Sequence, residues 1–301
     1  MQKNGKNNIN YNNRHVSEIS TADVITVSPR MSIIGAVEMM AEKGFRRLPV
    51  TDSGTGKVLG IVTAGDIINF IGGGEKFNLV SHKHKGNVIS ALNDNVREIM
   101  SPKVLSVREN ARIQEVASLI VEKKCGGIPI LDADGAIKGI VTERDVLKVM
   151  NYQDSPLTVR DVMTRSPYIT SPDNTVTNVA KEMISHKFRR LPVVSEDVLF
   201  GIITAMDIMK YVGNGGVFKN MVTGDVSDII SVSVRDVMSG NLYTTSPDVS
   251  TRDAAIQMIE KNVGALPVIE DSNLVGVITE FDVVRLLSQS GNGNSSPGKD
   301  Y

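Results

Sequence analysis

Two phrases recur four times along this chain, and their first copies are RRLPV at residues 46–50 and GIVTAGD at residues 60–66. The first phrase returns as GGIPI at 126–130, RRLPV at 189–193 and GALPV at 264–268. The second phrase returns as GIVTERD at 139–145, GIITAMD at 201–207 and GVITEFD at 276–282. Self-similarity of this kind indicates a repeat architecture in which each copy is one supersecondary unit. The sequence therefore predicts four copies of one folding unit.

An apolar phrase ending in methionine precedes three of the four copies. It ends at Met100, Met163 and Met238, and each time the proline of the next phrase follows 29 residues later. In copy 1 the same offset falls on Ser20. The constant distance indicates that the repeated unit begins well before the RRLPV phrase.

Each copy is predicted to have the order β-α-β-β-α. An extended segment such as VITV at 24–27 comes first, and a helix follows in which Ile33, Val37 and Met40 fall at helical spacing. The proline of RLPV disfavours a helix and extends the residue before it, so two strands and a second helix complete the unit. A unit of about 60 residues cannot bury all of its apolar faces alone, so we expect the copies to pair.

The connectors indicate which copies pair. The aspartate of copy 1 lies 34 residues before the methionine of copy 2, and the matching distance between copies 3 and 4 is 31 residues. Only 18 residues separate copies 2 and 3. Phe77 and Phe218 each follow the aspartate of their copy by 11 residues, so the two long connectors resemble each other. We therefore expect copies 1 and 2 to form one module and copies 3 and 4 another.

The predicted domain boundaries follow from this pattern. We expect the copies at residues 15–71, 95–151, 157–213 and 232–288, with connectors at 72–94 and 214–231. The ends, residues 1–14 and 289–301, are rich in Asn, Lys, Gly and Ser. They have too little apolar surface to offset the entropy of ordering, so we expect two disordered tails.

Composition limits the function classes. The formal net charge of −1 provides no general attraction to nucleic acid or to a membrane surface, so any anion site must be built locally. The single cysteine, Cys125, excludes an internal disulfide and suits a reducing cytoplasm. No apolar run approaches the length of about 18 residues that a membrane helix needs. We therefore expect a cytoplasmic protein.

The order of these phrases resembles the CBS motif, two of which form a Bateman module. The match covers about residues 16–288. Four motifs in one chain, with RRLPV in copies 1 and 3, resemble archaeal stand-alone CBS proteins and the regulatory gamma subunit of AMP-activated protein kinase. The resemblance implies an α/β (α+β) fold in which the four motifs pair into two Bateman modules that form a disc. It also implies adenine-nucleotide sites between the motifs.

The Thr-x-x-Asp sequence that ends each second phrase has two compatible interpretations. Thr followed three residues later by Asp before an apolar run is close to a helix capping box. The resemblance implies that the Asp also accepts hydrogen bonds from both ribose hydroxyls and that the Thr lies near the sugar or phosphate. Both roles suit an exposed helix N-terminus, which favours phosphate. The residues are Asp66, Asp145, Asp207 and Asp282, with Thr63, Thr142, Thr204 and Thr279.

Arginine pairs occur only in copies 1 and 3, as Arg46, Arg47, Arg189 and Arg190. They form either a solvated basic edge or a phosphate clamp, since guanidinium groups match phosphate oxygens bidentately. The resemblance favours the clamp. Arg144 either faces phosphate or forms a salt bridge. Because copies 2 and 4 carry Gly126-Gly127 and Gly264-Ala265 instead, we expect two strong and two weak sites.

Further residues are assigned to adenine by the resemblance, although ordinary sheet and turn chemistry also explains them. They are the hydroxyl residues Thr26, Ser106, Thr170 and Thr245 and the strand residues Ile61, Ile140, Ile202 and Val277. The segment HKHK at 82–85 is expected to be a solvated loop rather than a metal or anion site. Neither a zinc spacing nor a catalytic motif occurs, so we expect no metal and no enzyme activity.

These observations favour a regulator that binds AMP, ADP or ATP and acts on an unidentified protein target. A second hypothesis is a sensor of S-adenosylmethionine or another adenosyl ligand. A third is an interaction scaffold or nucleic-acid binder, which the net charge disfavours. We expect either a monomer that forms the whole disc or a homodimer.

Overall fold

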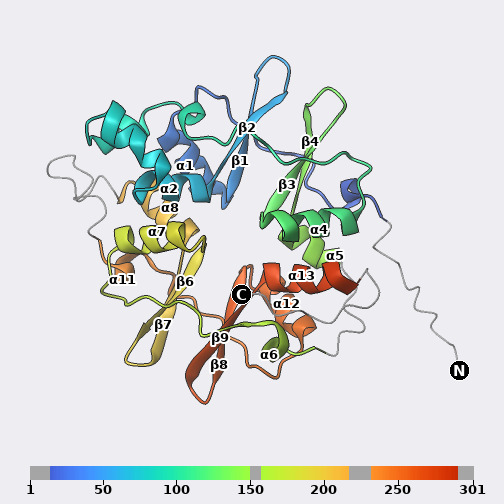
Figure 1. Ribbon diagram of the computed structural model, residues 1–301, viewed down its shortest axis with the longest axis vertical. Coiled ribbons are helices and arrows are strands. Elements are labelled where there is room, and N and C mark those ends of the chain that lie inside the picture. Colours follow the sequence, from blue (N-terminus) through green and yellow to red (C-terminus); the bar gives the residue numbers. More distant parts are fainter. Residues whose placement is uncertain (1–13, 150–156, 217–231, 291–301) are drawn as a thin grey trace, which may run out of the picture.

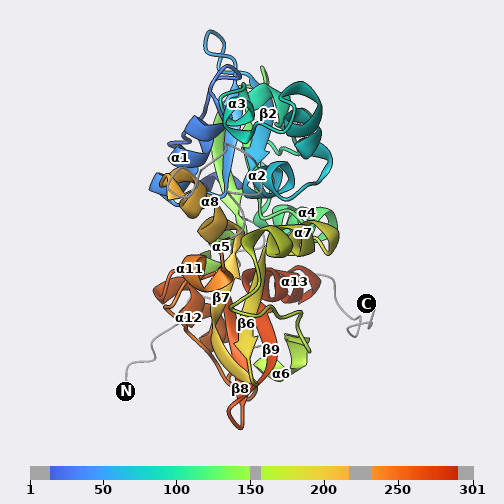
Figure 2. The ribbon, with the colours of Figure 1, turned by 90° about the vertical axis from the view of Figure 1, so that its left-hand side faces the viewer.

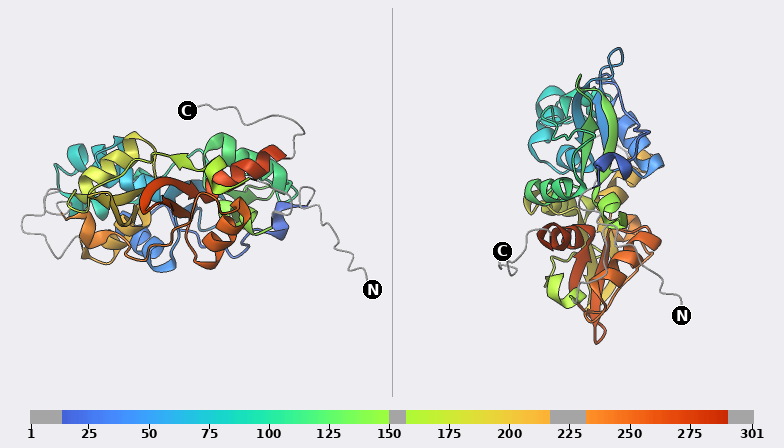
Figure 3. Two further views of the ribbon diagram at one scale, coloured as in Figure 1. Left: turned by 90° about the horizontal axis from the view of Figure 1, so that it is seen from below. Right: turned by 90° about the vertical axis from the view of Figure 1, so that its right-hand side faces the viewer.

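The computed structural model describes residues 14–149, 157–216 and 232–290. The four copies occupy the four quarters of a flattened molecule, with copies 1 and 2 at one end and copies 3 and 4 at the other (Figure 1). The molecule is seen edge-on in Figures 2 and 3. Both predicted tails, apart from residue 14 and residues 289–290, and most of the predicted second connector lie outside the described residues.

Each copy contains a helix, a β-hairpin and a second helix. In copy 1 these are α1 (Ile33–Lys43), β1 (Arg47–Thr51), β2 (Val58–Thr63) and α2 (Ala64–Ile71). In copy 2 they are α4 (Ile113–Lys123), β3 (Gly127–Leu131), β4 (Ile137–Thr142) and α5 (Glu143–Val149). In copy 3 they are α7 (Val176–Ser185), β6 (Arg190–Ser195), β7 (Val198–Thr204) and α8 (Ala205–Gly213). In copy 4 they are α12 (Thr251–Glu260), β8 (Ala265–Glu270), β9 (Asn273–Thr279) and α13 (Glu280–Ser290).

Short elements lie before the copies and in the first connector. Those before the copies are η2 (Val16–Glu18), η5 (Val96–Glu98), α6 (Val159–Val162), β5 (Thr164–Arg165) and α11 (Val234–Val237). Those in the connector are η3 (Glu75–Phe77), the π-helix η4 (Leu79–Lys83) and α3 (Val88–Leu92). The HKHK segment is therefore partly helical rather than a loop, but His82, Lys83 and Lys85 are exposed to solvent, as expected. His84 lies between Ser90 and Asp94, with ring nitrogens 2.7 Å from Ser90 Oγ and 2.8 Å from Asp94 Oδ2.

The first predicted strand of each copy is reduced to a single parallel bridge. In copy 1, Val27 donates to the carbonyl of Pro49 at 3.0 Å and accepts from the amide of Thr51 at 2.9 Å. The next rung of a parallel ladder would need an amide from Pro49, which has none. The proline that identifies the motif thus also ends the ladder, and the same bridge recurs at Val107, Thr170 and Thr245.

Copies 1 and 2 pair with each other, and copies 3 and 4 do the same, as predicted. The segment before each copy crosses to its partner: Thr21 bridges Ile140, and Ser101 bridges Ile61. In the second module β5 pairs with β9, and Ser239 bridges Ile202.

The repeated methionine explains the glycine of the second phrase. A Cβ on Gly60 would lie 2.7 Å from the Sδ atom of Met100, a separation that real side chains do not show. Met163 approaches Gly276 in the same way, at 2.6 Å. In copy 1 the corresponding partner is Ser20, whose Oγ would lie 3.1 Å from a Cβ on Gly139. Each glycine therefore makes room for the segment that crosses over from the partner copy.

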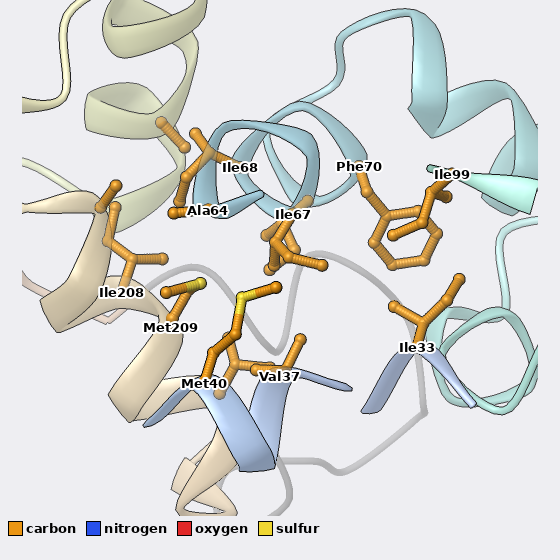
Figure 4. Packing of buried hydrophobic residues seen from close by; sticks show 14 of the residues in the cluster. Ile33, Val37, Met40, Ala64, Ile67, Ile68, Phe70, Ile99, Ile208 and Met209 are labelled. Atoms are coloured by element: carbon orange, nitrogen blue, oxygen red, sulfur yellow. The ribbon is translucent and has the colours of Figure 1, made fainter. Parts of the chain in front are cut away.

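The hydrophobic cores join the modules. One core combines residues of copies 1 and 3, and the other combines residues of copies 2 and 4. Helix α1 packs on α8 and α2 on α7, while α13 packs on α4 and α5. Figure 4 shows Met40 and Val37 of α1 beside Met209 of α8, with Ile67 of α2 close by. The apolar faces that each unit cannot bury alone are thus buried across the module boundary.

Candidate functional site

A cavity of about 510 Å³ lies between the modules and is lined by residues of all four copies. All four arginines of the RRLPV phrases line it: Arg46, Arg47, Arg189 and Arg190. Lys103 and Lys124 line it too, whereas Asp207 is the only acidic residue in its lining. Six cations and one carboxylate line the cavity, and two buried glutamates pair with Arg46 and Arg189 from behind the lining, so the cavity keeps a positive charge in a chain that is nearly neutral overall.

The central cavity extends into both modules. The Ile61 arm lies between copies 1 and 2 and is lined by Ile61, Thr63, Leu105, Cys125 and Pro129. The Ile202 arm lies between copies 3 and 4 and is lined by Ile202, Thr204, Asp207, Tyr243, Val263 and Pro267. Each arm takes its Ile and Thr from one copy and its other apolar walls from the partner copy. A flat apolar group in either arm would thus have a charged centre at one end.

A second cavity, of about 400 Å³, is the Ile140 cleft between copies 2 and 1. It is lined by Ile140, Thr142 and Asp145 of copy 2 and by Ile25, Phe45 and Pro49 of copy 1. Arg46, Arg47 and Arg144 line it as well. It repeats the arrangement of the arms, because an apolar section again ends at guanidinium groups.

The fourth equivalent position lines neither cavity. Val277 and Asp282 are buried, with 6% and 5% exposure. The rings of Tyr168, His186 and Phe188 lie against one another in the partner copy: His186 stacks on Phe188, and Tyr168 contacts both at a tilt, with Tyr168 and Phe188 centroids 5.1 Å apart. Among the sequence-predicted residues, those of copies 1, 2 and 3 are thus brought to cavities more completely than those of copy 4.

In all four copies the Asp of Thr-x-x-Asp accepts hydrogen bonds from its Thr, and in copies 1, 3 and 4 the Asp amide also donates to the Thr hydroxyl, as the capping-box spacing predicts. Each Thr hydroxyl donates to Oδ2 of the Asp, at 2.6 Å for Thr63 and Thr204 and at 2.7 Å for Thr142 and Thr279. The backbone amide of each Thr donates to the same oxygen. Capping therefore occupies one carboxylate oxygen and leaves Oδ1 for another partner.

The second oxygen, Oδ1, differs between the copies. Asp145 Oδ1 lies 3.9 Å from Lys148 Nζ, and Asp282 Oδ1 lies 3.5 Å from an Arg285 nitrogen. Burial raises the pKa of Asp207, although the hydrogen bonds from Thr204 oppose the rise. Asp66 Oδ1 instead accepts a hydrogen bond from Lys76 of the connector. Asp66 does not line the central cavity, whereas Asp207 does.

Two buried glutamates stand among the arginines and were not anticipated from the sequence. Glu143 and Glu280 are only 3% and 2% exposed. Arg189 donates to Glu143 at 3.2 Å, which joins copy 3 to copy 2. Arg46 pairs with Glu280 at 3.6 Å, which joins copy 1 to copy 4. The central ion pairs therefore cross the boundary between the modules.

Arg144 pairs with Glu280, so the salt bridge that was one of its two interpretations is present. Its Nε donates to Glu280 Oε1 at 2.6 Å, and another nitrogen donates to Asn262. The residue still lines the Ile140 cleft. The repeat itself contains a signal for both glutamates. In copies 1 and 3, which carry the arginine pairs, the residue after the Thr is alanine (Ala64 and Ala205), whereas in copies 2 and 4, which carry glycine in place of the first arginine, it is glutamate.

The glycines of copies 2 and 4 provide the space for the arginines of copies 1 and 3. A Cβ on Gly127 would lie 1.8 Å from Arg47 Nη1, and one on Gly264 would lie 3.1 Å from Arg46 Nη2. Arg47 Nη1 is buried without a hydrogen-bond partner among the described residues. Burial lowers the pKa of Arg47 and of Arg190 to about 10 each, and the neighbouring arginines add to the effect. An anion that enters the cavity would give Arg47 Nη1 a hydrogen-bond partner and would offset the unfavourable burial of the two guanidinium charges.

The four hydroxyl residues assigned to adenine are not equivalent, which corrects the sequence-based assignment. Thr170 and Thr245 form the parallel bridge that Val27 forms in copy 1, so they lie one position further along than Thr26 and Ser106. Side chains of an extended chain alternate in direction, so the two pairs point differently. None of the four lines either cavity. Thr26 Oγ accepts from Thr51 Oγ at 3.1 Å instead.

The remaining side chains have less bearing on the site. Burial raises the pKa of the Cys125 thiol, although Arg47 opposes the rise, so the thiol is not activated. Among the described residues, His, Cys, Asp and Glu form no group of three or more suited to a metal ion. Within the same residues, no helix combines the length and the apolar character needed to cross a membrane.

The CBS domain profile matches four stretches of the chain, residues 16–73, 96–152, 159–214 and 234–289. The chain belongs to the CBS-domain family. It is similar to protein MJ1225 of Methanocaldococcus jannaschii, with 38% identity over 88% of this chain and 95% of that protein. The crystal structure of MJ1225, described as a candidate archaeal homologue of g-AMPK, superposes with a TM-score of 0.86 over 91% of this chain and 99% of that chain, at 37% identity. This CBS protein is also similar to a 33.4 kDa protein encoded in a ribosomal RNA operon of Thermofilum pendens, with 28% identity over 87% of this chain and 88% of that protein.

Proposed function

We propose that this CBS protein is a non-catalytic regulator that binds adenine nucleotides, with the base in an apolar arm and the phosphates at the arginine centre. The observation that carries the proposal is the combination of apolar arms with a centre lined by six cations. A purine base suits the arms, and a phosphate suits guanidinium groups. The similarity to a protein described as a candidate homologue of g-AMPK agrees with this assignment.

The Ile202 arm is the most complete site in this proposal. Ile202 and Pro267 would flank the base, and Tyr243 offers an aromatic face. Asp207 Oδ1 would accept the ribose hydroxyls while Oδ2 keeps its bond from Thr204. Two or three charge-assisted contacts of about 1.5–3 kcal/mol each would supply much of the roughly 8 kcal/mol that micromolar affinity requires.

The charge of the cavity favours nucleotides over S-adenosylmethionine. The methionine side of that ligand carries a sulfonium and an ammonium against a single carboxylate, so a net positive charge would replace the phosphate at the arginine end of an arm. Repulsion from Arg46, Arg189 and their neighbours would weaken its binding. AMP, ADP and ATP place one to three phosphates there, so we propose them as the ligands.

Regulation follows if occupied and empty forms present different surfaces to a protein target. A ligand phosphate would compete with Glu143 and Glu280 for arginines that belong to the opposite module. Such competition changes the pairs that hold the two modules at the centre. Only a ligand that binds two arrangements differently can shift the balance between them.

The test is isothermal titration of AMP, ADP, ATP and S-adenosylmethionine into the whole protein and its Asp207→Ala variant. We expect heat with the nucleotides and at least one site fewer, or about tenfold weaker, in the variant. The matched control is Asp161→Ala, because Asp161 forms the same capping box with Thr158 on α6 but lines neither cavity. An equal loss of nucleotide affinity in both variants, or no heat with any nucleotide, would refute the proposal.

A further inference from the structure

The residue three positions after the ribose aspartate is basic in three copies. It is Lys148, Lys210 or Arg285, and each follows its aspartate along the same helix. The distances to Oδ1 are 3.9 Å for Lys148 and 3.5 Å for Arg285, and both side chains remain substantially exposed. In copy 1 the same position is Asn69. Copy 1 therefore obtains the cation near its aspartate from somewhere else.

That cation is Lys76 of the first connector. Its ammonium group donates to Asp66 Oδ1 and to the backbone carbonyl of Ile99. The Lys76 side chain is 24% exposed and that of Asp66 12%, so the cation of this pair is more enclosed than Lys148 of copy 2 or Arg285 of copy 4. Ser101 Oγ also donates to Asp66 Oδ1, at 3.5 Å. Oδ1 is thus committed to protein donors, as Oδ2 is to the helix cap.

Asn69 holds Lys76 in this place. Its side-chain oxygen accepts a hydrogen bond from the Lys76 backbone amide at 2.7 Å, and its carbonyl accepts from the Gly74 amide at 3.0 Å. The substitution that removes the basic residue from α2 therefore also anchors the replacement. The arrangement depends on two residues of one copy, Asn69 and Lys76, and is specific to that copy among those whose contacts are described.

We propose that Lys76 occupies the ribose position of the copy 1 site and makes that site the one closed by default. A ribose there needs Asp66 Oδ1 as an acceptor, and it becomes available only when Lys76 withdraws. The inference rests on the proposed function, since it concerns an adenosyl ligand in the Ile61 arm. It changes the expectation of two strong and two weak sites, because the site of copy 1 would no longer be one of the strong ones.

Withdrawal of Lys76 would also change contacts outside the site. The connector leaves α2 through Gly72, where a Cβ would lie 2.8 Å from Ile184 and 2.9 Å from Ala180 of α7. Helix α7 belongs to copy 3, in the other module. Movement of the segment that carries Lys76 therefore alters a close contact between the modules, which connects occupancy of this site to their packing.

The variant that tests the proposal is Lys76→Met in the whole protein, titrated with AMP. Methionine keeps the aliphatic length and removes the charge. We expect either one more AMP per chain than in the wild type or a weakest site that is at least tenfold tighter, since a charge-assisted hydrogen bond no longer has to be broken. Lys76→Gln, which keeps a donor for the Ile99 carbonyl, should give a smaller gain.

The control is Lys43→Met in the same copy. Lys43 forms an exposed pair with Glu42 at 2.8 Å and lines neither cavity, so its loss should leave the number of sites unchanged. Adding Asp66→Ala to Lys76→Met should abolish the gained site. Wild-type binding with no gain in a folded Lys76→Met protein overturns this inference alone, whereas absence of AMP binding in the wild type overturns the proposed function. Melting curves of each variant verify folding.

Discussion

Arginine and glycine occupy complementary positions around the centre of the molecule, and two glutamates sit between them. Arg47 extends over Gly127, where any larger side chain would collide with it. Glu280 receives Arg144 of copy 2 and Arg46 of copy 1 while lying at the start of α13 in copy 4. One buried carboxylate therefore ties three copies together. Removing it leaves two guanidinium groups without their counter-ion.

Replacement of Glu280 by alanine should destabilise the protein by about 1–3 kcal/mol, because it removes a charge-assisted hydrogen bond from Arg144 and the ion pair with Arg46, whose side chains are 21% and 39% exposed. Urea unfolding followed by circular dichroism measures the loss. The matched control is Glu270→Ala, which removes a carboxylate from an exposed pair with Arg160 and should change stability little. Equal effects of the two substitutions would contradict the role assigned to Glu280.

The first connector is a structured element rather than a linker. Its π-helix η4 ends at Lys83, and the side chains of Lys83 and of the next residue, His84, both bind Asp94. Burial raises the pKa of Asp94, but the hydrogen bonds from Lys83 and His84 outweigh it and hold the pKa at about 2. This carboxylate fixes the end of the connector that also presents Lys76 to copy 1.

The connector should lose stability in acid between about pH 4 and pH 2. A carboxylate whose folded pKa lies below its unfolded value stabilises the fold above the unfolded pKa and ceases to do so as pH falls through the folded one. The unfolded value is 3.8 and the folded value is about 2. Hydrogen exchange of residues 79–94 across this range measures the effect. In Asp94→Asn the pH dependence attributable to this group should disappear, and its persistence there would refute the assignment.

Several elements were accessible from the sequence because they depend on local chemistry. The capping boxes at Thr63 and Thr204 follow from spacing alone, and the pairing of copies follows from connector length. The partners of Glu143 and Lys76 could not be predicted from the sequence, because only the assembled fold brings these residues close to Arg189 and Asp66. The misplacement of Thr170 reflects a shift of one residue, which reverses the direction of a side chain in extended structure.

At the scale of the whole molecule, the two modules share both hydrophobic cores. Copies 1 and 3 bury α1, α2, α7 and α8 together, and copies 2 and 4 bury α4, α5, α12 and α13 together (Figure 1). Residues such as Met40 and Met209 have no exposure at all. Separation of the modules would expose the apolar faces of both cores. Ligand binding at the centre is therefore expected to shift the modules relative to each other without separating them.

A shortened chain that ends after residue 156 should therefore self-associate or unfold. The faces of α1 and α4 that pack on α8 and α13 in the whole chain would be exposed, and such apolar surface favours association. Sedimentation and thermal melting of the half-chain, compared with the full chain at equal concentration, give the readout. A monomeric half-chain that melts at the temperature of the full chain would refute the shared-core account.

The central claim is that adenine nucleotides bind with their phosphates among the arginines of both modules. A crystal structure of the whole protein grown with AMP tests it most directly. We predict AMP in the Ile202 arm, with its ribose hydroxyls on Asp207 Oδ1 and its phosphate beside the arginines that line the central cavity. AMP bound elsewhere with the arm empty, or a phosphate directed away from the arginines, would contradict the account.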